Sequence, residues 1–247
     1  MPPVSAGHDA TRMRLDGFDG RVALITGGAR GIGRRIAEAV AAQGAKVAVI
    51  DTDIAEDAPH LLSVVADVRD ASAIDGACSQ IERELGPIDM LVTSAGIFRP
   101  MPFEDLTPEL FRETVDVNLT GSFLSARRVL PGMRKRSFGR VITISSGAGL
   151  DGGTEASAHY ATSKAGVIVL AKSLSKEYAP HGVTVNCVAP RSIRTRMIAG
   201  LEDDLTASTP VGRLGEPDDV AAAATFLLSA HASYITGEVM VLNGGWW

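Results

Sequence analysis

Short apolar runs alternate with longer segments of helical period along nearly the whole chain, and this alternation limits the possible fold more than any other feature. Seven runs rich in β-branched residues stand at 22–25, 46–50, 61–66, 88–93, 140–145, 183–188 and 238–242, and helical segments lie at 32–43, 71–85, 108–133, 160–178 and 217–228. Strands that alternate with helices pair in parallel, and runs that are apolar throughout are typical of strands covered on both faces. The sequence therefore predicts an α/β fold with a doubly wound, seven-stranded parallel sheet and helices on both faces.

The composition and the absence of internal boundaries indicate one domain. Hydrophobic residues make up 45% of the 247 residues and charged residues 21%, which is enough apolar material for a sizeable core. No linker rich in Pro, Gly or Ser divides the chain, and it contains no internal repeat. We expect residues 1–19 to form a flexible N-terminal lead-in and residues 20–247 to form the single domain.

Charge and cysteine content argue against several classes of function. The formal net charge is −5, whereas non-specific nucleic-acid binding requires a basic surface. No run of about 18 apolar residues is present, and the first 20 residues contain no apolar signal-peptide core. Cys78 and Cys187 fall in segments expected to be helix and buried strand, which fits a reducing compartment. We therefore expect a cytoplasmic protein with no nucleic-acid partner, no membrane association and no metal site.

A glycine-rich segment, TGGARGIG at residues 26–33, joins the first strand directly to a helix. Gly27 can form the tight turn, while Gly31 and Gly33 allow a pyrophosphate to approach the backbone and the helix to pack closely on the sheet. The helix N-terminus, which begins near Arg30 and Ile32, offers free N–H groups and a positive dipole to that anion. Glycine-rich turns often have no ligand, but the strand before and the helix after this one favour dinucleotide binding.

Asp51, at the end of the second strand, bears on the choice between NAD and NADP. A carboxylate there can accept hydrogen bonds from both adenosine ribose hydroxyls, and it repels a 2′-phosphate. Arg30 points the other way, because an arginine in the glycine loop can pair with a 2′-phosphate. The fixed carboxylate favours NAD over NADP. After the third strand, Asp67 is placed to accept from the adenine amino group and Val68 to donate from its backbone, although a helix cap would explain Asp67 equally well.

Three polar residues follow the fifth strand. Ser146 ends that run, and Tyr160 and Lys164 stand four residues apart, so they share one helix face. Such a pair is often only part of an amphipathic surface, but downstream of a dinucleotide loop it suits hydride transfer. Tyr160 would then be the general acid/base, its pKa lowered by a nearby ammonium and by the cationic nicotinamide, and Ser146 would bind the substrate oxygen.

Together these motifs resemble the short-chain dehydrogenase/reductase family, in its single-domain members of about 250 residues. TGGARGIG matches the family's TGxxxGxG and YATSK, at 160–164, matches its YxxxK. The resemblance implies a Rossmann fold for residues 20–247, with Ser146, Tyr160 and Lys164 as catalytic residues. It also implies that Lys164 binds the nicotinamide ribose, and that Asn118, the fourth catalytic residue, kinks a helix and holds a relay water.

The resemblance extends the expected cofactor site to two more segments, and both depart from the family pattern. Pro190, Ile193 and Thr195 match the segment that contacts the nicotinamide and phosphates, but Arg191 stands where the family has glycine. Ser94, Ala95 and Gly96 are expected beside the adenosine, although Thr93 and Ser94 replace two asparagines of the family's NNAG. We expect a rearranged hydrogen-bond network at Thr93–Ser94 and an influence of Arg191 on substrate choice.

Three functions remain open from the sequence. The first is an NAD-dependent oxidoreductase that interconverts a secondary alcohol (a polyol, sugar alcohol or cyclic alcohol) and the corresponding ketone. The alternative is an NADPH-dependent 3-ketoacyl reductase of fatty-acid type, in which the basic cluster Arg134, Lys135, Arg136 and Lys176 would dock an acidic carrier. A non-catalytic cofactor-binding regulator is disfavoured by the complete catalytic set. The substrate lid is expected at 191–216. The resemblance implies a homotetramer, with Trp246 and Trp247 packed at a subunit interface.

Overall fold

Seven parallel strands form one sheet in the order β3-β2-β1-β4-β5-β6-β7 in the computed structural model, which describes residues 14–54, 58 and 60–246. The strands are β1 (Val22–Thr26), β2 (Lys46–Asp51), β3 (Leu62–Val65), β4 (Ile88–Thr93), β5 (Gly139–Ile144), β6 (Val183–Pro190) and β7 (Val239–Leu242). The predicted doubly wound, seven-stranded parallel sheet is confirmed.

Each strand supplies side chains to both faces of the sheet, as its continuous apolar sequence requires. In β1, Ala23 and Ile25 join one hydrophobic core, whereas Val22 and Leu24 join the core on the opposite face. All five residues of β1 are buried, because successive side chains of a strand point in opposite directions and both faces are covered.

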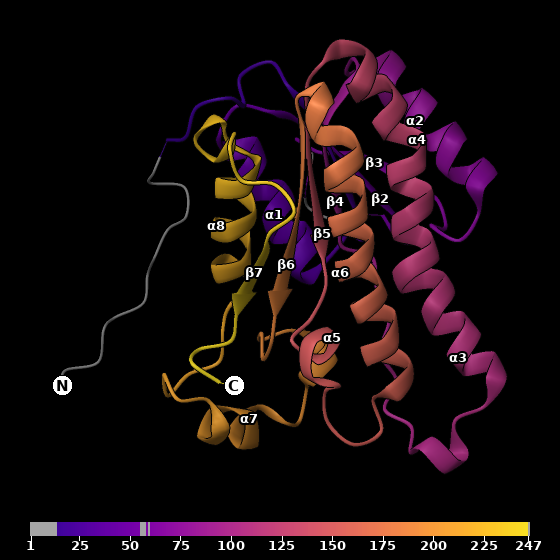
Figure 1. Ribbon diagram of the computed structural model, residues 1–247, viewed down its shortest axis with the longest axis vertical. Helices are drawn as coiled ribbons and strands as arrows, with labels where there is room; N and C mark the ends of the chain where they lie inside the picture. Colours follow the sequence, from indigo (N-terminus) through magenta and orange to yellow (C-terminus); the bar gives the residue numbers. More distant parts are fainter. Residues whose placement is uncertain (1–13, 55–57, 59, 247) are drawn as a thin grey trace.

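Helices cover the sheet in two layers (Figure 1). Helices α1 (Gly31–Ala42) and α8 (Pro217–Leu228) pack on one face, and α2 (Ala71–Glu84), α4 (Gly121–Arg136) and α6 (Ala158–Tyr178) pack on the other. Three shorter helices, α3 (Pro108–Val115), α5 (Ala148–Asp151) and α7 (Glu202–Ser208), lie toward the carboxyl ends of the strands. Among the described residues, no helix is long and apolar enough to cross a membrane.

The helix predicted over 108–133 is wrong as a single element. It is divided into α3 and α4 by a π-helical turn at Asp116–Thr120. The wider turn carries Asn118, whose amide is buried and hydrogen-bonded to the backbone of Ile97. Hydrophobic period alone predicts one helix here, because the interruption depends on that tertiary contact.

Part of the N-terminal segment that was expected to be flexible packs against the domain. Residues 1–13 of the expected flexible lead-in lie outside the described residues. In its remaining part Phe18 is fully buried, the amide of Leu15 donates to Gln43, and the carbonyl of Asp16 accepts from Ala230. Between β2 and β3 the described residues contain no helix, while 55–57 and 59 fall outside them.

The functional end of the sheet is set by the pairing of β1 with both β2 and β4. From β1 the chain proceeds outward to β2 and β3, then crosses back to β4 and continues outward on the other side. The connections after β1 and β4 therefore diverge, which opens a crevice at the carboxyl ends of these strands.

Candidate active site

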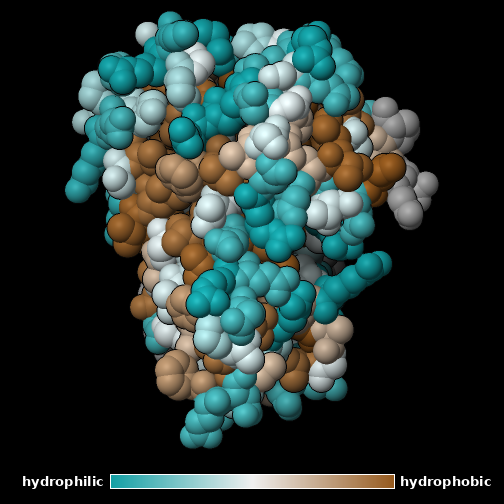
Figure 2. Space-filling view, turned by 90° about the vertical axis from the view of Figure 1, so that its right-hand side faces the viewer, coloured by the Kyte–Doolittle hydropathy of each residue, from teal (hydrophilic) through white to brown (hydrophobic). Residues whose placement is uncertain are grey.

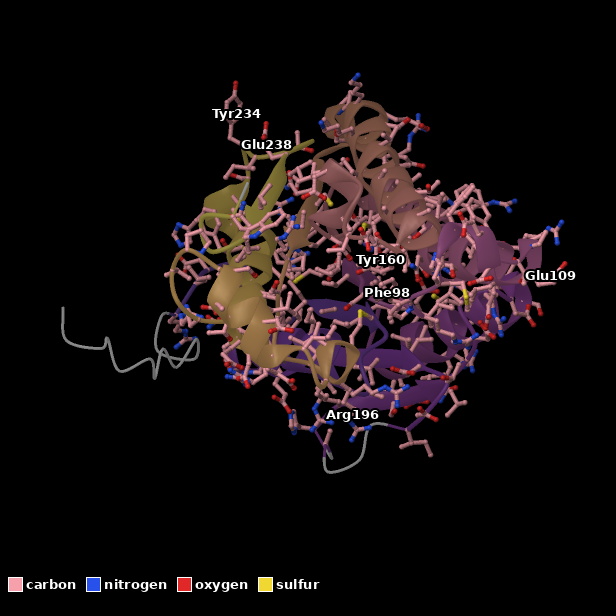
Figure 3. All side chains as sticks on the ribbon, turned by 90° about the horizontal axis from the view of Figure 1, so that it is seen from below. Phe98, Glu109, Tyr160, Arg196, Tyr234 and Glu238 are labelled. Atoms are coloured by element: carbon pink, nitrogen blue, oxygen red, sulfur yellow. The ribbon has the colours of Figure 1, made fainter. Side chains whose placement is uncertain are left out.

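A cleft of about 600 Å³ lies across the carboxyl ends of the strands. It brings together residues from the glycine loop, the strand ends, α6 and the segment after β6. The predicted residues that line it are Gly27, Arg30, Gly31, Ile32, Gly33, Asp51, Asp67, Val68, Ser94, Ala95, Gly96, Ser146, Tyr160, Lys164, Pro190, Ile193 and Thr195. Figure 3 shows the molecule from this side, with Tyr160 and Phe98 next to each other and Arg196 at some distance from them.

The glycine loop is packed so closely that side chains would not fit. Gly27 has a positive φ of 69°, and a Cβ there would lie 2.6 Å from the backbone of Ala95. A Cβ on Gly33 would lie 2.1 Å from the carbonyl oxygen of Gly27. No side chain caps the N-terminus of α1, so its N–H groups can bind an anion from the cleft.

At the adenosine end, Asp51 is fixed by the backbone. One carboxylate oxygen accepts from the amide of Ala29 at 3.0 Å, and the other accepts from the amide of Thr52 at 2.8 Å. Arg30 is directed away from this carboxylate, because its guanidinium forms an ion pair with Asp53 at 2.9 Å. The competition expected between Asp51 and Arg30 is therefore biased toward Asp51, since Arg30 has a carboxylate partner of its own.

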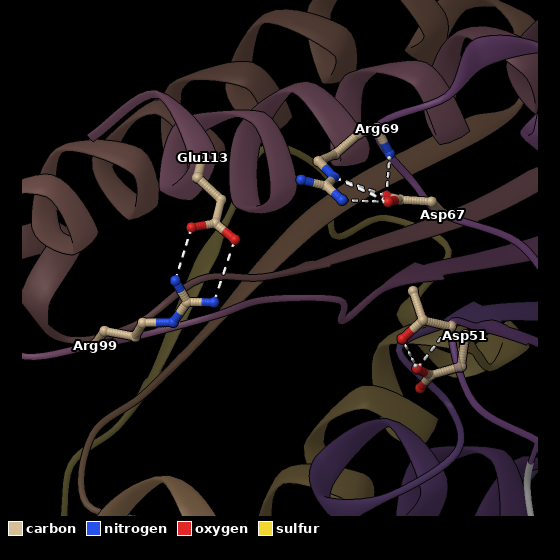
Figure 4. Close-up of polar contacts among 6 residues, drawn as sticks. Asp51, Asp67, Arg69, Arg99 and Glu113 are labelled. Carbon is tan, nitrogen blue, oxygen red and sulfur yellow. Dashed lines mark hydrogen bonds and ion pairs between the residues drawn. The ribbon is translucent and has the colours of Figure 1, made fainter. Parts of the chain in front are cut away.

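Asp67 lines the cleft and does not cap α2, whose N-cap is Asp70, and its predicted contact with adenine stays a prediction. Its carboxylate accepts three hydrogen bonds from the Arg69 guanidinium and one from the Arg69 backbone (Figure 4). The hydrogen bond from the Arg69 side chain lowers the pKa of Asp67 below its ordinary value. Arg69 also lines the cleft, as does Glu113, which pairs with Arg99. Neither residue was predicted: Glu113 is far from any strand end, and Arg69 is marked only by its nearness to Asp67.

Lys164 and Tyr160 occupy the other end of the cleft. Lys164 is 4% exposed, and its ammonium donates to the carbonyl of Ile144 at 2.9 Å. Burial lowers the pKa of Lys164 to about 8. Burial also raises the pKa of Tyr160, with the hydrogen bond to Ser146 acting in the opposite direction. The surroundings of the phenol in the protein thus raise its pKa, and the lowering expected from Lys164 together with the cationic nicotinamide stays a prediction. Nζ of Lys164 lies 5.7 Å from the ring centroid.

Asn118 lies behind the cleft and does not line it. Its side-chain oxygen accepts from the amide of Ile97 at 2.8 Å, and its nitrogen donates to the carbonyl of Ile97 and to Ser163. A Cβ on Gly96 would lie 3.3 Å from both the Asn118 oxygen and the Lys164 ammonium. Asn118 thus connects the π-helical turn, the segment after β4 and α6, the helix that carries Tyr160 and Lys164.

Two aromatic contacts fix the surroundings of Tyr160. The ring of Phe98 lies 4.7 Å from the Tyr160 ring and 6.1 Å from that of His159. His159 is fully buried, with Nε2 at 3.1 Å from the carbonyl oxygen of Arg99. Phe98 and Arg99 are not part of the cleft lining. The contact between His159 and Arg99 joins the segment after β4 to α6.

A parallel α/β sheet with an uncapped glycine-loop helix and a Ser–Tyr–Lys set at one cleft defines a dinucleotide-dependent oxidoreductase. Residues 27–247 match the family model described as enoyl-(acyl carrier protein) reductase. The chain is 40% identical over 241 residues to the 3-oxoacyl-(acyl-carrier-protein) reductase FabG of Escherichia coli, covering 92% of this chain and 98% of that protein. It is also 40% identical to the acetoacetyl-CoA reductase of Shinella zoogloeoides, covering 91% and 98% of the two chains.

The crystal structure of gox2181 matches with a TM-score of 0.88 at 35% sequence identity, covering 94% of this chain and 97% of that one. The chain therefore belongs to the short-chain dehydrogenase/reductase family. This family binds a nicotinamide dinucleotide, and the site fits such a group. The space that Gly27 and Gly33 leave beside an uncapped helix suits a pyrophosphate, and the Asp51 carboxylate suits ribose hydroxyls.

Replacing Gly33 by Ala should weaken dinucleotide binding. The new Cβ would meet the Gly27 carbonyl at 2.1 Å, so the loop must shift away from the geometry that binds the pyrophosphate. We expect roughly 2 kcal/mol, or about a 30-fold higher Kd for NADH, measured by fluorescence titration. Gly76→Ala in α2 is the matched control, because a Cβ there has no neighbour within 4 Å among the described residues. Equal affinities in the two variants would contradict the prediction.

Proposed function

We propose that this protein reduces the 3-keto group of a 3-oxoacyl thioester, with a nicotinamide dinucleotide as the hydride donor. The observation that carries the proposal is the position of Ser146 and Tyr160, which line one cleft together with the buried side chain of Lys164. The substrate class is supported by relatives named as 3-oxoacyl-(acyl-carrier-protein) and acetoacetyl-CoA reductases, which are similar over almost their whole lengths.

The direction of the Tyr160 pKa shift suits reduction of a ketone. When bound, the cofactor supplies a hydride to the carbonyl carbon. Ser146 donates a hydrogen bond to the carbonyl oxygen, and Tyr160 gives it a proton, which its raised pKa keeps available at neutral pH. Lys164 stabilises the phenolate that remains, because its ammonium lies near the ring in a site with little water.

The sequence first favoured NAD-linked turnover of a polyol, sugar alcohol or cyclic alcohol. Of this expectation, the comparisons support the oxidoreductase class but not the alcohol substrate. The relatives favour the alternative, the 3-ketoacyl reductase. The side chains of Arg134, Lys135 and Lys176 are exposed, but they stand at the C-terminal ends of α4 and α6, beside the amino ends of the strands. This is the end of the sheet opposite the cleft, so the cluster does not support docking of a carrier at the active site. Arg136 belongs to this cluster less fully, because one of its nitrogens donates to the carbonyl of Ile88.

For the cofactor we propose NADH in preference to NADPH. Asp51 lines the cleft and is held by two backbone amides, while Arg30 is paired with Asp53. A 2′-phosphate beside Asp51 would meet a carboxylate, and capturing it with Arg30 would require breaking that ion pair.

We further propose a homotetramer in the cytoplasm. Exposed apolar side chains support an assembly: Phe111, Phe123 and Val169 belong to α3, α4 and α6, and hydrophobic patches are visible on the face in Figure 2. Both cysteines are free and buried, which supports a reducing compartment.

The proposal predicts that Tyr160→Phe removes turnover and preserves cofactor binding. Wild-type protein should oxidise NADH in the presence of acetoacetyl-CoA, followed by the absorbance of NADH. The Phe variant lacks the proton donor, so kcat should fall by about 10²–10⁴-fold while the Kd for NADH stays within about twofold. A wild-type protein that binds NADH but leaves acetoacetyl-CoA unreduced would exclude the proposed function. Retained turnover in the variant would exclude the assigned mechanism.

The lowered pKa of Lys164 predicts a fall in activity at alkaline pH. The ammonium loses its proton as the pH rises through about 8, so kcat/KM for ketone reduction should be level at neutral pH. Well above pH 8 it should then fall by about tenfold per pH unit.

Deprotonation of Lys164 does not destabilise the fold, so unfolding caused by this residue cannot explain the predicted loss of activity. The folded-state pKa of Lys164 lies below its ordinary value of 10.5, so between these values the unfolded chain binds more protons. The contribution of Lys164 to the free energy of unfolding therefore rises with pH in this window. Denaturant titrations at pH 7 and pH 9 provide the control, and a pH profile of kcat/KM that stays level to pH 10 would contradict the prediction.

The assignment of Asp51 predicts that its removal changes cofactor preference. Wild-type protein should bind NADH more tightly than NADPH. Asp51→Ala should weaken NADH binding by about 10-fold, the effect of losing hydrogen bonds to a charged group, and should strengthen NADPH binding. Asp53→Ala is the matched control, because it removes a neighbouring carboxylate and should leave NADH affinity unchanged. A wild-type preference for NADPH would overturn the proposal.

A further inference from the structure

Arg191 is a cation at the catalytic end of the cleft that the reaction described above does not use. It follows β6 directly, at the position where the sequence pattern of the family has glycine, and it lines the cleft together with Ser146 and Tyr160. Its side chain is only 15% exposed. A buried arginine costs free energy unless its charge and its donors have partners, so its surroundings indicate its role.

Two side-chain contacts and one backbone hydrogen bond hold Arg191 in place. Nη1 donates to a carboxylate oxygen of Asp151, at the end of α5. The guanidinium lies over the ring of Trp246, 3.0 Å from the centroid. Its backbone amide donates to the carbonyl of Leu242 at 3.0 Å. Trp246 thus has a partner in its own chain. The subunit contact predicted for it stays a prediction, and Trp247 lies outside the described residues.

The fixed guanidinium is close to the catalytic serine. A Cβ on Gly147, the residue after Ser146, would lie 3.5 Å from the Cβ, Cγ and Nη1 of Arg191. The amide of Gly147 also donates to the carbonyl of Pro190 at 2.9 Å, which ties the two segments together. Within the described part of the chain, Nε and Nη2 of Arg191 have no hydrogen-bond partner, so two donor groups remain for a molecule in the cleft.

We propose that Arg191 is a specificity-determining residue that donates a hydrogen bond to the thioester carbonyl of a 3-oxoacyl substrate. This inference rests on the proposed function. A 3-oxoacyl thioester carries two carbonyl groups separated by one methylene, and Ser146 and Tyr160 bind the oxygen of the keto group. The second carbonyl then lies beside the keto group, on the side where a donor next to Ser146 can reach it.

The charge of the Arg191 surroundings favours a neutral acceptor over an anion. Asp151 already balances the guanidinium, and the hydrogen bond from Arg191 contributes to lowering the pKa of Asp151. A substrate carboxylate would bring a second negative charge close to Asp151, whereas a thioester oxygen would not. The site therefore selects the acyl thioester over the corresponding free 3-oxo acid, and it favours both over a ketone with no second carbonyl.

The test compares substrates with and without the second carbonyl. Arg191→Met keeps much of the side-chain length and removes the donors. We expect it to raise the KM for acetoacetyl-CoA by about 10-fold or more, and to leave the KM for pentan-2-one and the Kd for NADH within about twofold. Arg191→Lys should restore part of the lost affinity for the thioester. Arg194→Met is the matched control, because Arg194 is in the same segment but pairs with Glu216 and does not line the cleft.

The outcomes separate this inference from the function on which it rests. If wild-type protein reduces acetoacetyl-CoA and Arg191→Met raises the KM for both ketones equally, the role of Arg191 is overturned and the proposed function stands. If wild-type protein reduces pentan-2-one but not acetoacetyl-CoA, the proposed function fails, and the inference fails with it. An unchanged NADH affinity shows that a variant has kept its fold.

Discussion

The parallel pairing of β1 with β4 is the contact on which the rest of the structure depends. Strands buried on both faces need helices on both faces, and a right-handed crossover can supply both layers only if the direction of winding reverses once. That reversal occurs between β1 and β4 and separates the connections that follow them. The two connections still approach closely at one point, since a Cβ on Gly27 would touch Ala95. The cleft is therefore a consequence of the sheet order. Glycine at position 27 is what allows the two connections to approach each other at the base of the cleft.

Burial at the catalytic end has opposite effects on the two titratable groups, and both effects favour neutral forms. Desolvation raises the pKa of Tyr160, which favours the protonated phenol, and lowers the pKa of Lys164 to about 8, which brings its proton exchange closer to neutral pH. A phenol that stays protonated suits reduction, and an ammonium with a pKa of about 8 can respond to charge that forms next to it. The hydrogen bond from Lys164 to Ile144 fixes the ammonium in position, because it ties the side chain to the end of β5.

Much of this arrangement could be predicted from the sequence, because its causes are local or follow from sheet order. The seven strands follow from apolar runs, and the convergence of residues 27, 51, 146 and 160 on one cleft follows from their places after strand ends. The parts that could not be predicted depend on distant partners. The resemblance implied a kink at Asn118, but the hydrogen bonds to Ile97 that hold it were not predicted, and the pairing of Asp67 with Arg69 depends on a rotamer. The stacking of Trp246 on Arg191 joins residues that no periodic pattern relates.

Ion pairing around the cleft explains why only a few of its charges are available to a ligand. Of the charged residues that line it, Arg30, Asp67, Arg69, Glu113 and Arg191 each form an ion pair. Among the described residues, Asp51, Lys164 and Arg196 line the cleft without an ion-pair partner. Arg196 follows Thr195, whose Cγ2 is 3.9 Å from a Cβ placed on Gly31, so this segment of the chain passes close to the glycine loop.

Different groups face a ligand in different parts of the cleft. A carboxylate stands at the end where ribose hydroxyls would bind, the first N–H groups of α1 have no side-chain cap among the described residues, and a buried lysine stands beside the catalytic tyrosine. Because the other charged residues are neutralised in pairs, the field in the cleft is dominated by these groups. The dinucleotide proposed above, without a 2′-phosphate, would offer hydroxyls to Asp51 and negative charge only at its pyrophosphate. The same reasoning applies at the substrate end, where the balanced pair of Arg191 and Asp151 offers hydrogen-bond donors without adding net charge.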